Sequence, residues 1–228
     1  MAVNHPTLEK IIGVKFKNKG LLKEALTHRS YLNENPNWGV PHNERLEFLG
    51  DAVLELAVTE ELYNRFPDQP EGQLTALRAA LVNYQMMSEV AREVGLEQHI
   101  LLSRGESKDT GKAREVILAN AIEAVIGAVY LDSDYKKSKK LVVDAILGHL
   151  DEVIKKGLYK DSKSSLQEKL QASKRLTPTY KVLSETGPDH AKIFVVGVYI
   201  GDELLATGQG ASKQDAEVAA ARAALEKR

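Results

Sequence analysis

The spacing of the apolar residues changes once along this chain, close to Gly157. From Leu8 to about Lys156 the apolar residues recur every three or four positions, which is the period of a helix with one buried side. No stretch in this part reads as a convincing pair of strands joined by a tight turn. The first 156 residues therefore predict an all-α domain, and Gly157 after two lysines is typical of a helix end.

The rest of the chain predicts a second, smaller domain. The segment "LYKDSKSS" after Gly157 is short, polar and rich in Lys and Ser, which predicts a linker over residues 157–162. Residues 163–228 show a helix, three strands and a final helix, and Gly201-Asp202 is a dipeptide favoured in tight hairpin turns. The expected fold class is thus multidomain, with an all-α domain over residues 1–156 and a small α+β domain of order α-β-β-β-α over residues 163–228.

Composition excludes several classes of protein. A chain of 228 residues that is 43% apolar can bury a substantial core. The absence of cysteine excludes a disulfide scaffold, a thiolate zinc site and a cysteine nucleophile. Because no signal-like start and no run of 18 apolar residues occurs, we expect a cytoplasmic protein with no membrane partner. The net charge is −1, so any nucleic-acid site has to be a local basic patch.

The segment "NERLEFLGDAVLEL", residues 43–56, carries four acids, the last of them Glu55, on an otherwise apolar helix. At 100° per residue Glu44, Glu47 and Asp51 fall within an arc of about 60°. A solvated helix face normally mixes acids with Lys and Arg, whereas here Arg45 is the only cation and points elsewhere. The stripe is therefore either a solvated face or a functional carboxylate site. The side expected to face the core carries four apolar residues: Leu46, Leu49, Val53 and Leu56.

A second acid stands alone on the apolar segment "VILANAIEAVIGAVYLD". Glu123 shares one face with Asn120, one turn earlier, and polar groups on such a helix are unfavourable without partners. Either the two form an ordinary polar pair between helices, or they meet Glu47 and Asp51 at a helix crossing. In the second case oxygen ligands alone would favour Mg²⁺, with Mn²⁺ as a substitute, and no organic cofactor. The six histidines are scattered singly, without a metal-binding spacing.

The acidic segment "ERLEFLGDAVLEL" resembles the signature helix of the ribonuclease III family. The blocks "ALTHRSY", "EGQLTALRAALVN" and "ILANAIEAVIGAVYLD" are similar to further blocks of that family, and "LQEKLQ", "GPDHAKIF" and "GASKQDAEVAAARAAL" resemble a double-stranded-RNA-binding domain. The resemblance covers nearly the whole chain. It implies a divalent-metal-dependent endoribonuclease that cleaves double-stranded RNA, processes ribosomal and messenger RNA precursors, and acts as a homodimer. Phe48 would then anchor the dimer or pack within the chain.

The resemblance also implies roles for individual residues. Glu47 corresponds to a metal ligand, Asp51 to a catalytic acid, Glu123 to a residue that is both, and Glu44 to an acid of the dimer or substrate surface. The family usually has Asp where this chain has Asn120, whose amide oxygen can bind a metal without adding charge. The alternative is therefore a protein that binds duplex RNA, with a nuclease site weakened or disabled by Asn120. A structural scaffold for RNA–protein assembly is a third possibility.

Three residues of the second domain are candidates for RNA binding. By resemblance, Gln167 on the first helix and His190 in the "GPDHAK" loop enter successive minor grooves, and Lys213 at the last helix meets phosphates. Exposed polar surface is the alternative for Gln167 and His190. From Lys160 onward the chain has 11 Lys or Arg and 9 Asp or Glu, a net charge of +2, and Gln214 stands where the family often repeats a basic residue. We therefore expect modest affinity for RNA.

Overall fold

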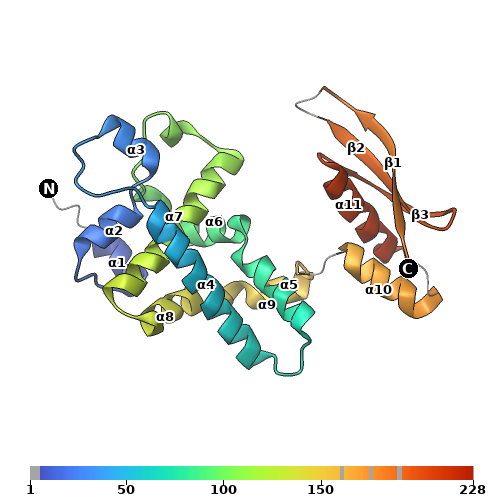
Figure 1. Ribbon diagram of the computed structural model, residues 1–228, viewed down its shortest axis with the longest axis horizontal. Coiled ribbons are helices and arrows are strands. Elements are labelled where there is room, and N and C mark those ends of the chain that lie inside the picture. Colours follow the sequence, from blue (N-terminus) through green and yellow to red (C-terminus); the bar gives the residue numbers. More distant parts are fainter. Residues whose placement is uncertain (1–5, 160–161, 175–176, 189–191, 228) are drawn as a thin grey trace. The chain divides into compact units, whose positions relative to one another are not determined.

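The computed structural model describes residues 6–159, 162–174, 177–188 and 192–227 (Figure 1). The chain divides into two compact units, residues 1–159 and 160–228. None of the helices in the described ranges is long and apolar enough to cross a membrane.

The first unit is built from helices, in agreement with the sequence, and the described part of it has no strand beyond an isolated bridge between Thr27 and Leu101. The helices and 3₁₀ turns are α1 (Pro6–Ile11), α2 (Lys19–Ala25), α3 (Arg29–Glu34), α4 (Glu44–Arg65), α5 (Glu71–Val82), α6 (Tyr84–Glu93), η1 (Leu96–Gln98), η2 (Glu106–Lys108), α7 (Gly111–Asp132), α8 (Tyr135–Ala145), η3 (Leu147–His149) and α9 (Leu150–Lys156).

Helix α7 runs through the centre of this unit, and α4 packs against it (Figure 1). Eleven residues of α7 are buried between Ile117 and Val129, as expected for a helix that is apolar nearly all round. Helix α9 ends at Gly157, which adopts the left-handed conformation with φ 63°. That conformation suits glycine, so the helix stops where the sequence predicted.

The buried face of α4 differs from the one expected. Leu46 and Val53 are buried as predicted, but Leu56 is 55% exposed and Leu54 is fully buried instead. At 100° per residue the buried face is centred between Gly50 and Leu54, which places Leu56 on the far side of the helix. The acidic stripe therefore lies at the margin of the buried face, next to α7, and not opposite the core.

Two glycines set the distance between α4 and α7. A Cβ atom on Gly50 would lie 1.8 Å from the backbone oxygen of Glu123, and one on Gly127 would lie 2.3 Å from the backbone oxygen of Leu46. Both distances are far inside van der Waals contact, so only glycine permits the two backbones to approach this closely. The crossing places the acid-bearing turn of α4 directly against the turn of α7 that carries Glu123.

The second unit has the predicted α-β-β-β-α order: α10 (Ser162–Lys174), β1 (Thr179–Thr186), β2 (Ile193–Ile200), β3 (Glu203–Gly210) and α11 (Lys213–Glu226). The three strands form an antiparallel sheet in the order β1-β2-β3. Gly201 and Asp202 form the turn between β2 and β3, with Gly201 at φ 57°. The core of the unit consists of Leu166, Leu170, Val198, Ile200, Ala206, Ala220, Ala221 and Ala224.

Candidate nuclease site

The acids of α4 differ in their surroundings. Glu44 is exposed and forms an ion pair with Arg29 at 3.4 Å, so it is partly neutralised. Glu47 is half-buried and Asp51 is exposed. Burial, followed by the negative charges of Glu44 and Asp51, raises the pKa of Glu47, and a side-chain hydrogen bond with Asn120 acts in the opposite direction. The carboxylate of Glu47 is therefore in contact with α7 through Asn120.

Helix α7 supplies the most strongly perturbed acid. Glu123 is half-buried, and burial together with the charges of Asp51 and Glu47 raises the pKa of Glu123 to about 8. These interactions show that Asn120 and Glu123 lie beside the two acids of α4. The crossing of the two helices thus brings together the four candidate residues that the sequence separates by more than sixty positions.

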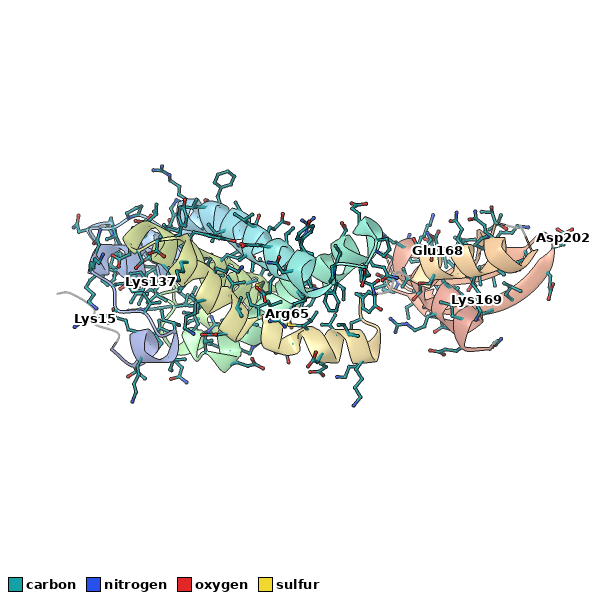
Figure 2. All side chains as sticks on the ribbon, turned by 90° about the horizontal axis from the view of Figure 1, so that it is seen from below. Lys15, Arg65, Lys137, Glu168, Lys169 and Asp202 are labelled. Carbon is teal, nitrogen blue, oxygen red and sulfur yellow. The ribbon has the colours of Figure 1, made fainter. Side chains whose placement is uncertain are left out.

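No cation compensates this cluster within the described residues. None of the ion pairs there involves Glu47, Asp51 or Glu123, whereas Arg65, at the other end of α4, is paired with Glu61 at 3.0 Å (Figure 2). Mutual repulsion and burial favour protonation of such carboxylates unless a cation binds. Oxygen donors from carboxylates and one amide are the donor set that Mg²⁺ and Mn²⁺ prefer. The residues present therefore fit a hard divalent cation.

The carboxylates are neighbours but do not form a closed ligand set. In the part of the chain that the structure describes, no three His, Asp or Glu side chains are arranged closely enough to hold a metal ion. A cation would have to draw the carboxylates together through changes of side-chain rotamer. Removal of charge repulsion would favour such a change, because the same cation neutralises the acids it brings closer.

His28, in the "ALTHRSY" block, has a structural position. Its Nδ1 lies 2.8 Å from the Ser30 hydroxyl and accepts a hydrogen bond from the Ser30 amide, which caps the start of α3. Burial lowers the pKa of His28 and favours the neutral ring that can accept this bond. His28 therefore supports a helix terminus.

The candidate RNA-binding residues lie in the second unit. Gln167 is exposed on α10. The two residues that follow it, Glu168 and Lys169, are also exposed (Figure 2). Lys213 is exposed in the first turn of α11, where the Ser212 hydroxyl accepts a hydrogen bond from the Asp215 amide at 3.1 Å. Its ammonium lies 5.8 Å from the centre of the Phe194 ring. His190 lies outside the described residues.

Gly50 and Gly127 position the site by permitting the close approach of α4 and α7, and reasoning from the sequence missed both. Glycine inside a long helix is unfavourable by about 1 kcal/mol relative to alanine, and this was the available signal. A glycine retained in a helix interior often marks a close approach of another backbone. One such glycine in each of the two acid-bearing helices points to their mutual crossing.

The two units match known protein families, which defines the class of protein. Residues 18–150 match the family model "Ribonuclease-III-like", and residues 162–228 match "Double-stranded RNA binding motif". Together the two matches define a nuclease of double-stranded RNA with separate catalytic and binding units.

Several proteins are similar over nearly the full length. The chain is 46% identical to "Ribonuclease 3" of Carboxydothermus hydrogenoformans, over 96% of this chain and 94% of that protein. It is 42% identical to "Ribonuclease 3" of Borreliella burgdorferi, over 94% of this chain and 87% of that protein. The chain is also similar to a solved structure, the nuclease domain of Ribonuclease III from Campylobacter jejuni. The sequence identity is 41% and the TM-score is 0.58, over 64% of this chain and 97% of that one. That structure is described as flexible in a region involved in dimer formation. The chain belongs to the ribonuclease III family, and it is an endoribonuclease of that type.

Proposed function

We propose that Glu47, Asp51, Asn120 and Glu123 bind one or more Mg²⁺ ions, which Mn²⁺ can replace, and that the site hydrolyses the phosphodiester bonds of duplex RNA. The observation that carries this proposal is the cluster of uncompensated carboxylates at the α4–α7 crossing, with the pKa of Glu123 raised to about 8. A bound divalent ion would neutralise charge on the phosphate and activate a water for attack. No serine, cysteine or lysine nucleophile is required.

The residues of the site would have different roles, because they differ in burial and position. Glu47 and Glu123 are half-buried between the helices, so they can hold the cation in a fixed place. Glu123 has to release its proton as the ion binds, because a carboxylate and not a carboxylic acid is the ligand. Asp51 is exposed, so its carboxylate can orient the attacking water on the substrate side.

Incubation of the purified protein with labelled duplex RNA and Mg²⁺ tests this function. We expect defined cleavage products that disappear when Mg²⁺ is chelated. A protein that binds the duplex and never cuts it, at any Mg²⁺ or Mn²⁺ concentration, would instead support the binding-only alternative with a site disabled by Asn120.

Replacement of Asn120 by Asp should strengthen metal binding. The substitution adds a full negative charge beside Glu47 and Glu123, so we expect half-maximal cleavage at a Mg²⁺ concentration about tenfold lower, which corresponds to about 1.4 kcal/mol. The substitution also removes the side-chain amide of Asn120, which forms a hydrogen bond with Glu47. In a chelator, the Asn120→Asp variant should therefore melt at a lower temperature than the parent at neutral pH.

Titration of both proteins with Mg²⁺ and with Mn²⁺ measures this effect. Mn²⁺ binds such sites more tightly than Mg²⁺. The metal concentrations for half-maximal cleavage should therefore differ less between the two proteins in Mn²⁺ than in Mg²⁺. Superimposable Mg²⁺ curves would mean that Asn120 does not contact the metal. Cleavage by Asn120→Asp alone would identify the parent as a duplex-RNA-binding protein with a disabled site.

We propose that residues 1–156 form the catalytic domain, residues 157–162 the linker and residues 163–228 the double-stranded-RNA-binding domain. Gln167 would contact a minor groove and Lys213 the phosphates, since both are exposed and Lys213 stands at a helix N-terminus. His190 belongs to the same proposal by resemblance. Recognition would depend on the shape and 2′-hydroxyls of the duplex more than on base sequence.

Removal of the binding domain should make cleavage dependent on low salt. Residues 1–159 contain 20 Lys or Arg and 23 Asp or Glu, a net charge of −3, so the catalytic unit attracts RNA weakly by itself. A fragment ending at Tyr159 keeps the core complete, because Tyr159 packs against it. We expect this fragment to cut at roughly 50 mM salt and to be at least about tenfold slower than the full chain at roughly 200 mM. Equal activity at the higher salt would assign the C-terminal domain another role.

We propose a homodimer in which Phe48 inserts into a groove of the second copy. Phe48 is 82% exposed, and beside it lies a groove of about 630 Å³. Apolar residues from three helices line the groove together with charged or polar side chains: Leu21, Leu46, Leu49 and Leu131, with Glu24, His42, Glu44 and Arg45. A two-fold dimer would bury both phenylalanines in equivalent grooves.

The Phe48→Glu substitution should dissociate this dimer. A buried aromatic anchor contributes about 2 kcal/mol or more to an interface, and a carboxylate in its place would be desolvated, so we expect dimerisation to weaken by at least about a hundredfold. Sedimentation equilibrium measures the change. Tyr63→Glu is the matched control, because Tyr63 is 71% exposed on the same helix but does not line the groove. An unchanged dimer in Phe48→Glu would place the interface elsewhere.

We also infer that the substrates are duplex stems in ribosomal and messenger RNA precursors, processed in the cytoplasm. The resemblance to bacterial ribonuclease III supports this proposal, and the cysteine-free composition suits a reducing compartment. Sequencing of RNA ends in cells that lack the protein is the test. Ribosomal precursors with normally matured ends in those cells would contradict it.

A further inference from the structure

The sheet of the second unit has one covered face and one open face. Val196, Val198 and Ile200 of β2 point toward the helices and are buried. Because side chains alternate along a strand, Ile193, Val195, Gly197 and Tyr199 belong to the opposite face. This opposite face carries none of the RNA-binding candidates on α10 and α11. Three of its four positions on β2 are nevertheless apolar or aromatic.

Side chains from all three strands converge over Gly197 on this open face. A Cβ atom placed on Gly197 would lie 3.2 Å from Cδ1 of Leu183, 2.9 Å from Cε2 of Tyr199 and 2.9 Å from Cδ1 of Leu204. These side chains cover the buried Gly197, yet Leu183 is 46% and Leu204 is 47% exposed. Ile193, on the same face of β2, is 49% exposed. We call Leu183, Ile193, Val195, Tyr199 and Leu204 the open-face patch.

Charge is sparse around this patch. Lys181 is the one charged residue among the open-face positions paired across the three strands, and its ammonium lies 5.0 Å from the centre of the Tyr199 ring. Asp202 stands beyond the patch, in the β2–β3 turn at the end of the sheet (Figure 2). Contiguous apolar surface of this kind on a sheet typically marks an interaction site.

We propose that the open-face patch packs against the same patch of a second copy of the chain. The patch consists of five side chains, and its three most exposed members are only about half exposed, whereas a free-standing interface buries about 800 Å² per partner. It is too small for a stable dimer between separate molecules. Two copies already joined through their nuclease domains, however, meet at an effective concentration of about 1 mM, at which a small patch suffices. The proposal thus rests on the homodimer proposed above.

The cross-strand register shows how the one charge on the face can be accommodated. Lys181 pairs with Gly197, and Gly197 pairs with Thr207, so the three residues form one row across the sheet. A two-fold axis parallel to the strands lays β1 over β3 of the second copy. Lys181 then faces the Thr207 hydroxyl of the second copy and avoids a second Lys181. The helix face of each module, which holds the RNA-binding candidates, stays accessible.

The absence of cysteine makes this contact directly measurable in the full-length protein. Thr207→Cys places a single thiol at an exposed position on the open face, and Gln171→Cys places one at an exposed position on α10. In the proposed arrangement the two copies of residue 207 are offset by two strand spacings, about 10 Å, in addition to the sheet-to-sheet spacing of about 10 Å. A bismaleimide that spans roughly 14 Å should therefore link two copies of the Thr207→Cys protein through their single thiols. The Gln171→Cys protein should give at least tenfold less covalent dimer.

A second substitution distinguishes cross-linking through a specific contact from cross-linking through random collision. Leu204→Glu in the Thr207→Cys background should lower the yield of covalent dimer at least tenfold, while Gln171→Glu, which adds the same charge outside the patch, should leave it unchanged. Equal yields in these two proteins, or no covalent dimer in the Thr207→Cys protein itself, would overturn the proposal. Slow labelling of the introduced thiol without covalent dimer would also overturn it, because another surface would then cover the face.

Sedimentation of the same proteins distinguishes this proposal from the homodimer on which it rests. The Leu204→Glu protein should remain a dimer through its nuclease domains. A dimeric Thr207→Cys protein that gives no cross-link would refute the open-face contact alone. A monomeric parent would refute both proposals.

Discussion

The Glu123→Gln variant should lose cleavage by about a thousandfold or more, which corresponds to about 4 kcal/mol of transition-state stabilisation. Glutamine keeps the size of the side chain but removes the charge that would hold a divalent ion at the α4–α7 crossing. Binding of duplex RNA should stay within a few-fold of the parent, because binding depends mainly on the second unit. Cleavage assays at saturating Mg²⁺ and filter binding of the same duplex measure the two quantities separately.

The same variant should change how stability depends on pH in the presence of a chelator. In the parent, the pKa of Glu123 is raised from 4.5 to about 8, so the folded state retains a proton that the unfolded state releases. The contribution of Glu123 to the free energy of unfolding is therefore largest below pH 4.5 and falls as the pH rises toward 8. The total loss of stability from this group is on the order of a few kcal/mol. Glu123→Gln lacks this titration, so its melting temperature should exceed that of the parent at about pH 8.

Glu115→Gln is the matched control for both measurements. Glu115 lies on the same helix and is half-buried, but it does not belong to the acidic cluster. It should cut and melt like the parent. A Glu123→Gln protein that cuts at a rate near that of the parent would show that the metal site lies elsewhere.

Gly50→Ala should destabilise the first unit by about 3 kcal/mol or more and should impair cleavage as well. The added methyl group would lie 1.8 Å from the backbone oxygen of Glu123, so the helices have to move apart. Their separation removes packing around Leu54 and shifts Glu47 and Asp51 away from Glu123. Urea denaturation and cleavage assays under conditions where the variant is folded measure these effects.

Gly72→Ala provides the control for the same chemical change in a helix. Gly72 lies in α5, and a Cβ atom there would meet no other atom within 4 Å. Alanine should then leave stability unchanged or raise it by about 0.5–1 kcal/mol, because it favours the helix. If Gly50→Ala were as stable and active as Gly72→Ala, the close approach of α4 and α7 would not determine the site.

Much of the local structure follows from the sequence alone. The periodicity separates a helical unit from an α-β-β-β-α unit, Gly157 ends α9, and Gly201-Asp202 turns the last hairpin. These features depend on backbone preferences and short-range hydrogen bonds, which a few neighbouring residues determine. The apolar character of α7 likewise predicts its place at the centre of the first unit.

The sequence could not select the buried face of α4, and it could not join the acids into one site. Apolar residues occupy several sides of α4, so its pattern suits more than one orientation, and Leu56 was wrongly expected in the core. The orientation is decided by contact with α7, where Gly50 and Gly127 permit backbones to meet at a distance that no other residue allows. That contact places Glu47 and Asp51 beside Glu123 and raises the pKa of Glu123. Local spacing determined which side chains share a helix face, whereas the burial and mutual repulsion of the acids arise only when two distant helices pack together.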